Sequence, residues 1–373
     1  MRGKLLIDGV FVSGALRIEN GRIAAIERVD AAPDQPFIVP GLVDLHVHGF
    51  GGHEPTEDLA GMARALAAHG TTAFLPTLFP DEPARLGATA ERVARDARAA
   101  FDAGGARPLG LHLEGPFVNP ARAGALSPAA LAEPSVEALA ALLEPSSGAE
   151  RGVRIVTLAP ELPGAAPLIE ELVRAGVHVS LGHSLATAAE ARGAARAGAA
   201  GATHLYNAMG PLHHRDAGLA NFALSDDALY AEIIGDLQHV GSEAFALALR
   251  ARGARGLCLV SDALAGAGSG CQVFETHVHR CRSADGAAWI VDDDPDAPPR
   301  LAGSVTSQLE AVRRLVRAGV VSLEEALTMA SETPARALGV EADLGRITVG
   351  ARADLLVLRG SALELERVLV GGR

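Results

Sequence analysis

Hydrophobic and polar positions follow two different patterns along this chain, and the middle shows the more regular one. Apolar runs of strand length alternate there with alanine-rich stretches of helical character, such as Thr56 to His69 and Ala165 to Ala175, each ended by a glycine. The eight apolar runs cover residues 38–48, 71–77, 108–114, 153–159, 177–183, 201–205, 229–234 and 256–262. Strand–helix alternation repeated in this way predicts an α/β fold, a parallel (β/α)8 barrel of the TIM type, over residues 40–340.

The two ends of the chain have a different texture. Short apolar runs near the N-terminus are divided by the turn pairs Asp8-Gly9 and Asn20-Gly21, which are typical of β-hairpins. Similar short runs return near the C-terminus, for example at Leu355 to Leu358. We therefore predict a small β-sandwich domain built from both termini, residues 1–39 together with 341–373. Residues 263–300 break the alternation and predict a long excursion after the eighth strand.

Composition and charge narrow the range of partners. The chain has 373 residues and a formal net charge of −12, whereas general nucleic-acid binders have basic surfaces, so no nucleic-acid partner is expected. Asp8 interrupts the apolar run Leu5 to Ile7, and no apolar run reaches about 18 residues, so neither a signal peptide nor a transmembrane helix is expected. Three cysteines are too few for a disulfide scaffold. We expect a cytoplasmic protein without a membrane partner.

Polar side chains occur where the predicted strands end. His46 and His48 are two positions apart on one strand, so both point to one face, which we take to be the barrel interior. Taken alone, the pair is equally compatible with two hydrogen-bonded core histidines. Other strand ends add further candidate ligands, namely Glu114, His183, His204 and Asp262. The whole set predicts one or two divalent ions, with Zn first and Fe, Co, Mn or Ni as alternatives.

Asp262 is the candidate for proton transfer in such a centre. A divalent ion lowers the pKa of water and polarises a carbonyl group. A neighbouring carboxylate can then take a proton from the water and pass it to a leaving amine. The alternatives for Asp262 are an ordinary strand-end carboxylate or a hydrogen-bond partner of a metal ligand.

Several longer strings resemble the amidohydrolase superfamily and, within it, the N-acetylglucosamine-6-phosphate deacetylase family. The strings are Pro40 to Gly49, Gly110 to Phe117, Gly182 to Ser184, Thr203 to Met209 and Leu259 to Ala263. The resemblance covers nearly the whole chain. It implies that Glu114, His183 and His204 hold the main ion and that Asp262 is the general base and acid. Related amidohydrolases bridge two ions with a carboxylated lysine, but the only lysine here is Lys4, in the terminal sheet region.

The same resemblance implies a second ion and a substrate site. His46 and His48 match residues that bind a second metal in some members of the family. Asn207 and the backbone of Ala208 match sugar-phosphate contacts. Arg215 and His239 match a phosphate grip, one of them offered by a dimer partner, so a homodimer is expected. A substrate-lining loop is matched by Leu301, Ala302, Gly303 and Ser304.

Two features leave the substrate open. Members of the family often have a histidine contact to the sugar where this chain has Ala125-Leu126, and a leucine side chain neither donates nor accepts a hydrogen bond. Arg215 is also one of 32 arginines, most of which must lie on the surface. Gluco and galacto sugars therefore both remain candidates.

Three functions are compatible with these residues. The first is metal-dependent hydrolysis of the acetamide of N-acetyl-D-glucosamine 6-phosphate, giving D-glucosamine 6-phosphate and acetate. The second is a related deacetylase for N-acetylgalactosamine 6-phosphate or another N-acylated amine. The third is a non-catalytic binding protein on an amidohydrolase scaffold, which would not require all four of Glu114, His183, His204 and Asp262. We favour the first.

The segment from Cys271 to Cys281 offers a second, weaker metal hypothesis. It encloses His277 and His279, and two cysteines with two histidines can form a structural zinc site. The alternation of polar and apolar residues from Val273 onward more simply predicts a β-hairpin.

Overall fold

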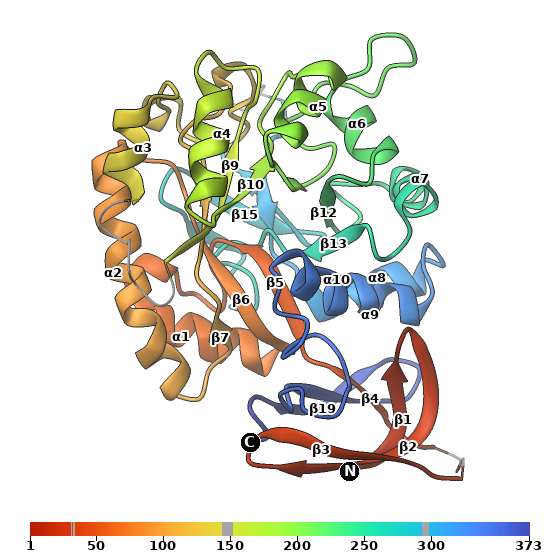
Figure 1. Cartoon of the computed structure of the whole chain (residues 1–373). Coiled ribbons are helices and arrows are strands. Elements are labelled where there is room, and N and C mark those ends of the chain that lie inside the picture. Colours follow the sequence, from red (N-terminus) through yellow and green to blue (C-terminus); the bar gives the residue numbers. More distant parts are fainter. Residues whose placement is uncertain (31, 33, 144–151, 293–297) are drawn as a thin grey trace.

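The computed structural model of the chain describes residues 1–373 except 31, 33, 144–151 and 293–297. Parallel strands form the centre, helices surround them, and a second sheet lies at one end, where the N- and C-termini meet (Figure 1). This arrangement confirms the predicted (β/α)8 barrel with a separate sheet from both termini. Within the described residues, no helix combines the length and apolar character needed to cross a membrane.

The barrel strands follow one another around the sheet in the order of the chain. They are β5 (Leu42–Val47), β6 (Thr71–Leu78), β8 (Leu111–Glu114), β9 (Val153–Leu158), β10 (His178–Leu181), β11 (Gly201–Ala202), β12 (Tyr230–Ile234) and β13 (Leu257–Val260), with β7 (Arg107–Pro108) paired to β6. The barrel closes between its first and last strands, where the Asp262 N–H donates to the His46 carbonyl over 2.9 Å. The buried Asp44 carboxylate supports this closure because it accepts from the N–H groups of His46 and Ser261.

The first predicted strand, 38–48, was wrong in its extent. The structure divides it into β4 (Phe37–Pro40), which belongs to the terminal sheet, and β5, which begins the barrel. The break falls at Gly41, where an added Cβ would collide with the side chain of Thr72. A glycine there lets the chain pass close to the neighbouring strand as it leaves one sheet for the other. The predicted run 201–205 also shortens to β11, because a turn begins at Thr203.

Helices cover the outside of the barrel (Figure 1). They are α1 (Pro55–Ala68), α2 (Pro83–Asp102), α3 (Val136–Leu143), α4 (Ala165–Arg174), α5 (Ala188–Arg196), α6 (Leu219–Ser225), α7 (Ser242–Arg252), α8 (Gln308–Arg317), α9 (Leu323–Ala330) and α10 (Glu332–Ala337), with short 3-10 turns at Pro120–Arg122 and Pro128–Ala130. The alanine-rich composition suits this layer because small side chains let helices approach the strands closely; Ala90, Ala94 and Ala97 of α2 are buried. A large apolar cluster joins these helices to the barrel strands.

The terminal sheet has the strand order β19-β18-β4-β1-β2-β3. Its remaining strands are β1 (Arg2–Ile7), β2 (Val10–Glu19), β3 (Arg22–Arg28), β18 (Leu355–Arg359) and β19 (Glu364–Leu369). Both predicted turn pairs adopt positive φ angles, Asp8-Gly9 at 49° and 81° and Asn20-Gly21 at 51° and 75°, as a tight hairpin requires. Leu5, Ile38 and Leu355 pack in the core of this sheet and tie the two chain ends together. The boundaries 1–39 and 341–373 against 40–340 stay a prediction.

The excursion after the last barrel strand is a small antiparallel sheet. It contains β14 (Val273–Glu275), β15 (Arg280–Ala284), β16 (Ala287–Ile290) and β17 (Leu301–Ser304). The expected hairpin is present, and His277 and His279 lie in its turn. Cys271 and Cys281 are free thiols, and the described residues contain no metal-binding cluster in this segment. The end of β17 returns to the barrel mouth, where the Ser304 N–H donates to the Asp262 carbonyl over 2.8 Å.

Candidate active site

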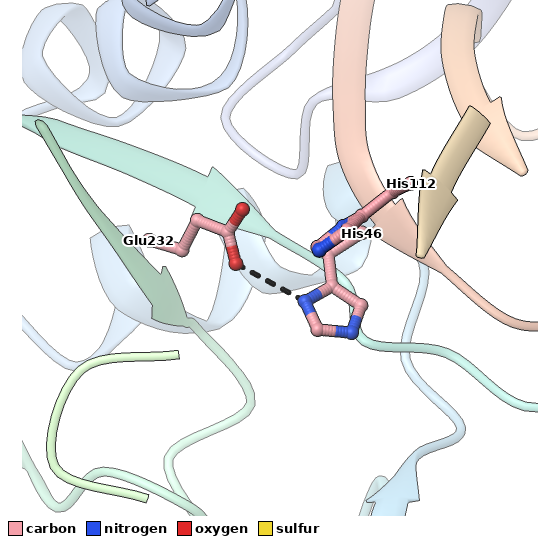
Figure 2. A group of neighbouring side chains, drawn as sticks. All are labelled: His46, His112 and Glu232. Carbon is pink, nitrogen blue, oxygen red and sulfur yellow. Dashed lines mark hydrogen bonds and ion pairs between the residues drawn. The ribbon is translucent and has the colours of Figure 1, made fainter. Parts of the chain in front are cut away.

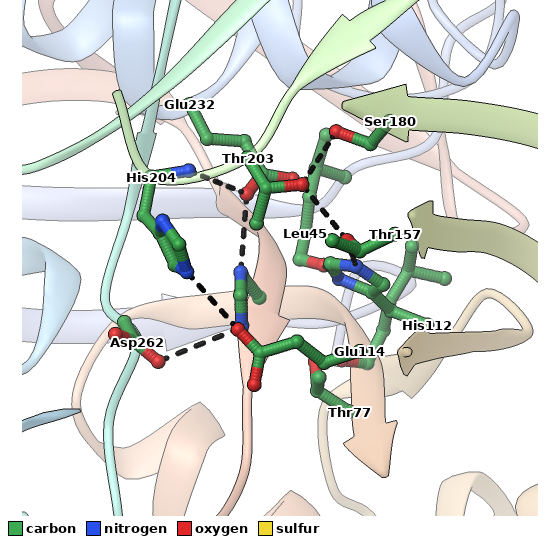
Figure 3. A network of polar contacts seen from close by, with 12 residues as sticks. Leu45, Thr77, His112, Glu114, Thr157, Ser180, Thr203, His204, Glu232 and Asp262 are labelled. Carbon is green, nitrogen blue, oxygen red and sulfur yellow. Dashed lines mark hydrogen bonds and ion pairs between the residues drawn. The ribbon is translucent and has the colours of Figure 1, made fainter. Parts of the chain in front are cut away.

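The predicted main ligands converge at the carboxyl-terminal mouth of the barrel, as Figure 3 shows in part. Oε1 of Glu114 lies 3.0 Å from Nε2 of His183 and 3.1 Å from Nε2 of His204, and the two Nε2 atoms are 3.0 Å apart. All three side chains are buried, with 4% of each residue exposed. They come from the ends of different strands, so only closure of the barrel brings them into contact.

His183, His204 and Asp262 share an unusual backbone conformation. Their φ angles are 47°, 29° and 47°, in the left-handed region that side chains other than glycine rarely adopt. Each such residue costs about 1–2 kcal/mol in backbone energy. Each lies two residues beyond the last residue of its strand, where the chain turns and aims the side chain across the barrel mouth. Strain of this kind is typical of functional sites, where the surrounding fold holds it in place.

The ring of His183 is oriented for metal binding. Its Nδ1 lies 2.8 Å from the carbonyl oxygen of Arg122, which only accepts, so Nδ1 carries the proton. Nε2 is then the nitrogen available to an ion, and it faces Nε2 of His204 and the Glu114 carboxylate. Three lone-pair atoms at this separation repel one another unless a proton or a cation lies between them. Two imidazoles and a carboxylate are a donor set suited to Zn²⁺ and similar ions, so the residues present fit the metal that the sequence predicts.

A second group of donors adjoins the first. Nε2 of His46 and Nε2 of His48 are 3.2 Å apart, which confirms that both rings lie on one face. Oε2 of Glu114 lies 3.2 Å from Nε2 of His48, while Oε1 lies 3.4 Å from Nε2 of His46. Oδ1 of Asp262 lies 3.5 Å from Nε2 of His46. Glu114 thus stands between two pairs of histidines, with Oε1 near His183, His204 and His46 and Oε2 near His48.

The electrostatics of this cluster favour a cation. Burial opposes ionisation of Glu114, but the rings of His46 and His183 outweigh it and hold the pKa of Glu114 well below its usual range. Burial likewise opposes protonation of His46, but Asp262 and Glu114 raise the pKa of His46 well above its ordinary value. The two shifts have complementary causes: the histidine rings stabilise the Glu114 carboxylate, and the carboxylates of Glu114 and Asp262 stabilise positive charge at His46. A divalent ion supplies the compensating positive charge that the pocket calls for.

A cavity of about 150 Å³ opens directly above the cluster. The sequence-predicted residues that line it are His48, Glu114, Ala125, Leu126, His183, His204, Asn207, Ala208, His239, Asp262, Leu301, Ala302 and Gly303. Three predicted residues lie elsewhere. His46 is completely buried below the cavity, and Ser304 is buried at the end of β17. Arg215 lies on an exposed loop with its Nη1 2.9 Å from Nε2 of His214.

His239 is held rigidly in the cavity wall. Its Nδ1 lies 2.7 Å from Oδ2 of Asp236, whose other oxygen accepts from the N–H groups of Gln238 and His239. Burial lowers the pKa of His239, but the hydrogen bond and the charge of Asp236 outweigh this effect and raise it above its ordinary value. A histidine that keeps its proton near neutral pH is suited to bind an anion.

The structure also places residues at the site that the sequence analysis missed. Glu232 on β12 lies 3.1 Å from Nδ1 of His46, and it could have been noticed as the one charged residue within the apolar run 229–234. Phe79 stacks on His48 with ring centroids 4.0 Å apart and lines the cavity. His279 contacts the carbonyl of Ala125 over 3.0 Å. No local pattern marks Phe79, and the sequence associated His279 with a separate zinc hypothesis, because each reaches the site only through the path of its loop.

Comparison with known proteins agrees with this geometry. Residues 37–373 match the Amidohydrolase family. N-acetylgalactosamine-6-phosphate deacetylase of Escherichia coli O157:H7 is 35% identical over 386 residues, covering 100% of this chain and 97% of that protein. N-acetylglucosamine-6-phosphate deacetylase of Vibrio furnissii is 35% identical over 366 residues, covering 95% of this chain and 88% of that protein.

A solved structure extends the likeness to the whole fold. It is an aspartate-to-alanine mutant of N-acetyl-D-glucosamine-6-phosphate deacetylase from Mycobacterium smegmatis, in complex with N-acetyl-D-glucosamine 6-phosphate. The two chains superpose with a TM-score of 0.87 at 30% identity, over 100% of this chain and 97% of that one. Fold, ligand cluster and sequence all lead to one conclusion: the chain belongs to the amidohydrolase family, in its group of amino-sugar-6-phosphate deacetylases.

Proposed function

We propose that this protein hydrolyses the acetamide of N-acetyl-D-glucosamine 6-phosphate, releasing acetate and D-glucosamine 6-phosphate. One observation carries the proposal: Glu114, His183 and His204 form a buried donor set at the floor of a cavity, and Asp262 lines the same cavity. The relatives named above are deacetylases of closely related sugar phosphates. A non-catalytic scaffold would have no reason to keep strained ligand positions around such a cavity.

Glu114, His183 and His204 would hold the main ion, and His46 and His48 would hold a second one beside Glu114. Zinc is the ion we propose first, with Fe, Co, Mn and Ni as alternatives, because imidazole and carboxylate ligands suit all of them. When bound, the metal polarises the amide carbonyl and makes water a stronger acid. The residues of this chain supply the remaining steps.

Asp262 would act as general base and then as general acid. Its carboxylate takes one proton from the attacking water, whose oxygen forms the new bond to the acetyl carbon. The C–N bond then breaks, and Asp262 returns the proton to the leaving amine nitrogen. The backbone of Asp262 is fixed on both sides, by its N–H to the His46 carbonyl and by its carbonyl to the Ser304 N–H. A carboxylate held in one place can serve both proton transfers.

The sugar phosphate would occupy the cavity above the ions. Asn207, Ala208 and the segment Leu301 to Gly303 line its wall, and His239 would meet the phosphate. Arg215 lies outside this cavity, so the predicted phosphate grip is completed only if a second subunit supplies its Arg215. We therefore propose a homodimer. A cytoplasmic location is proposed as well, since all three cysteines are free thiols.

N-acetylgalactosamine 6-phosphate is a second candidate substrate, and Leu126 is the reason. Leu126 lines the cavity and packs with Val118 and Ala123, so this wall offers the sugar an apolar surface in place of a polar contact. A wall without a donor or acceptor distinguishes weakly between epimers that differ only in the position of a hydroxyl group. The relative from Escherichia coli O157:H7 carries the galactosamine name.

Acetate release tests the proposal directly. Metal-reconstituted protein is assayed with N-acetylglucosamine 6-phosphate, its galactosamine epimer and unphosphorylated N-acetylglucosamine. We expect turnover of the glucosamine 6-phosphate that depends on divalent metal, and much slower turnover of the unphosphorylated sugar. Faster turnover of the epimer would favour the second candidate. No acetate from any of the three, with metal bound, would refute both.

Arg215→Ala should raise KM for the phosphorylated sugar by about 10–100-fold, because it removes charge-assisted hydrogen bonds to the phosphate. The KM for unphosphorylated N-acetylglucosamine should stay unchanged. Arg196→Ala, on the outer surface of α5, is the matched control and should alter neither value. Steady-state kinetics with both sugars decides, and an equal rise in KM for both would contradict a role in phosphate binding.

Asp236→Asn should lower the pH at which phosphate binding is lost. Asp236 raises the pKa of His239, so the protonated ring binds the phosphate below that pKa and releases it as the pH rises through it. Without the charge of Asp236, the same loss should begin at a lower pH, with KM about tenfold higher than wild type near pH 7.5. KM is measured from about pH 6 to 9. A pH profile identical to that of wild type would contradict the assigned role of His239.

A further inference from the structure

Glu232 is a completely buried carboxylate just below the candidate metal centre, and none of the roles assigned so far uses it. It lies on β12, 0% of its surface is exposed, and it neither lines the cavity nor reaches the sugar. Figure 2 shows it facing the ring of His46, with His112 beside them. A buried carboxylate is costly to retain unless its charge has a partner, so the partner is informative.

His46, His112 and Glu232 do not themselves form another ion site. Both nitrogens of His112 are already engaged, Nδ1 at 3.0 Å from the Leu45 carbonyl and Nε2 at 2.8 Å from the Thr157 hydroxyl. His112 therefore belongs to the hydrogen-bonded core of the barrel, which continues through Thr157 to Thr203 (Figure 3).

One oxygen of Glu232 supports two candidate ligands. Oε2 accepts from Nδ1 of His46 over 3.1 Å and from the backbone N–H of His204 over 3.4 Å. Because a carboxylate only accepts, Nδ1 of His46 carries a proton, and Nε2 is the nitrogen that would bind an ion beside His48 and Glu114. Oε1 of Glu232 has no hydrogen-bond partner among the described residues, so the charge is not shared with another donor.

We propose that Glu232 is a positioning residue that orients His46, increases the basicity of its Nε2 and thereby determines the affinity of the second ion at His46 and His48. The inference rests on the proposed metal centre. In this role Glu232 would act through His46 and would touch neither the ions nor the sugar. Carboxylates behind histidine ligands fix the ring and strengthen the metal–nitrogen bond, and their loss typically weakens metal binding by about 10–100-fold.

The test uses the full-length protein, stripped of metal and titrated with Co²⁺, whose visible spectrum reports the ligand geometry. Wild type should bind two ions. Glu232→Gln, which keeps the shape and an acceptor oxygen but removes the charge, should bind the first ion normally and the second about 10–100-fold more weakly. Glu232→Asp, which keeps the charge on a shorter side chain, should lose less. Asp354→Asn, a buried carboxylate in the terminal sheet region, is the matched control and should bind both ions as wild type does.

Two results would overturn the inference: a single Co²⁺ ion bound by wild type, or unchanged affinity and spectrum of both ions in Glu232→Gln. If the Gln variant fails to fold, Glu232→Asp decides, since unchanged affinity for both ions in that variant has the same consequence. The titration needs no substrate. If wild type releases no acetate but Glu232→Gln loses the second ion as expected, only the proposed function is refuted. If wild type releases acetate but Glu232→Gln binds both ions normally, only the role of Glu232 is refuted.

Discussion

Asp262→Asn is expected to slow acetate release by about 10³-fold while the bound metal remains. An asparagine keeps the size and backbone contacts of the aspartate but cannot take a proton from water, and general acid–base catalysis typically contributes about 10²–10⁴-fold. The measurements are kcat for N-acetylglucosamine 6-phosphate and metal content by elemental analysis. Both measurements are needed because Oδ1 of Asp262 lies 3.5 Å from Nε2 of His46, close enough for the two atoms to bind the same ion.

The two measurements separate the roles that the geometry allows. Loss of turnover with full metal content identifies Asp262 as the proton carrier. Loss of turnover together with the loss of one bound ion would instead make Asp262 a metal ligand. Retained turnover would contradict both roles, and the carboxylate would then be the ordinary strand-end residue that the sequence also allowed.

Glu114→Gln is expected to have the other large effect, because Glu114 faces both pairs of histidines. Its two oxygens lie 3.0 Å from Nε2 of His183 and 3.2 Å from Nε2 of His48. Removing the charge should weaken the binding of both ions by more than the roughly 100-fold expected for a residue that only contacts a ligand. Acetate release should fall by at least about 10³-fold, since metal assistance is worth several kcal/mol.

A matched glutamate controls for the general cost of the substitution. Glu161 lies at the same end of the barrel and accepts from the Leu185 N–H and the Ser184 hydroxyl, outside the ligand cluster. Glu161→Gln keeps an acceptor for these donors and should retain both ions and near-normal turnover. Metal content of the two variants is compared after dialysis against equal free Zn²⁺. Full metal in Glu114→Gln would exclude Glu114 as the shared ligand.

Much of the fold was open to prediction because its signals are local. Apolar runs separated by helices that end at glycine reproduce the barrel strands, and the pairs Asp8-Gly9 and Asn20-Gly21 mark real hairpins. The exception is instructive. The run 38–48 has apolar residues on both sides of Pro40-Gly41, so hydrophobic pattern alone did not reveal that Gly41 divides it between two sheets.

By itself, the sequence determined that polar groups stand at the ends of apolar strands, since a barrel places all of those ends at one mouth. Only the tertiary structure decided which groups meet. It put Glu114 between two histidine pairs, Glu232 behind His46, and the distant segment Leu301 to Gly303 beside Asp262, while leaving Arg215 outside the cavity. The physical reason is that hydrophobic periodicity records which face of an element is buried, whereas contacts across the barrel depend on strand register, closure and loop paths that no local pattern contains.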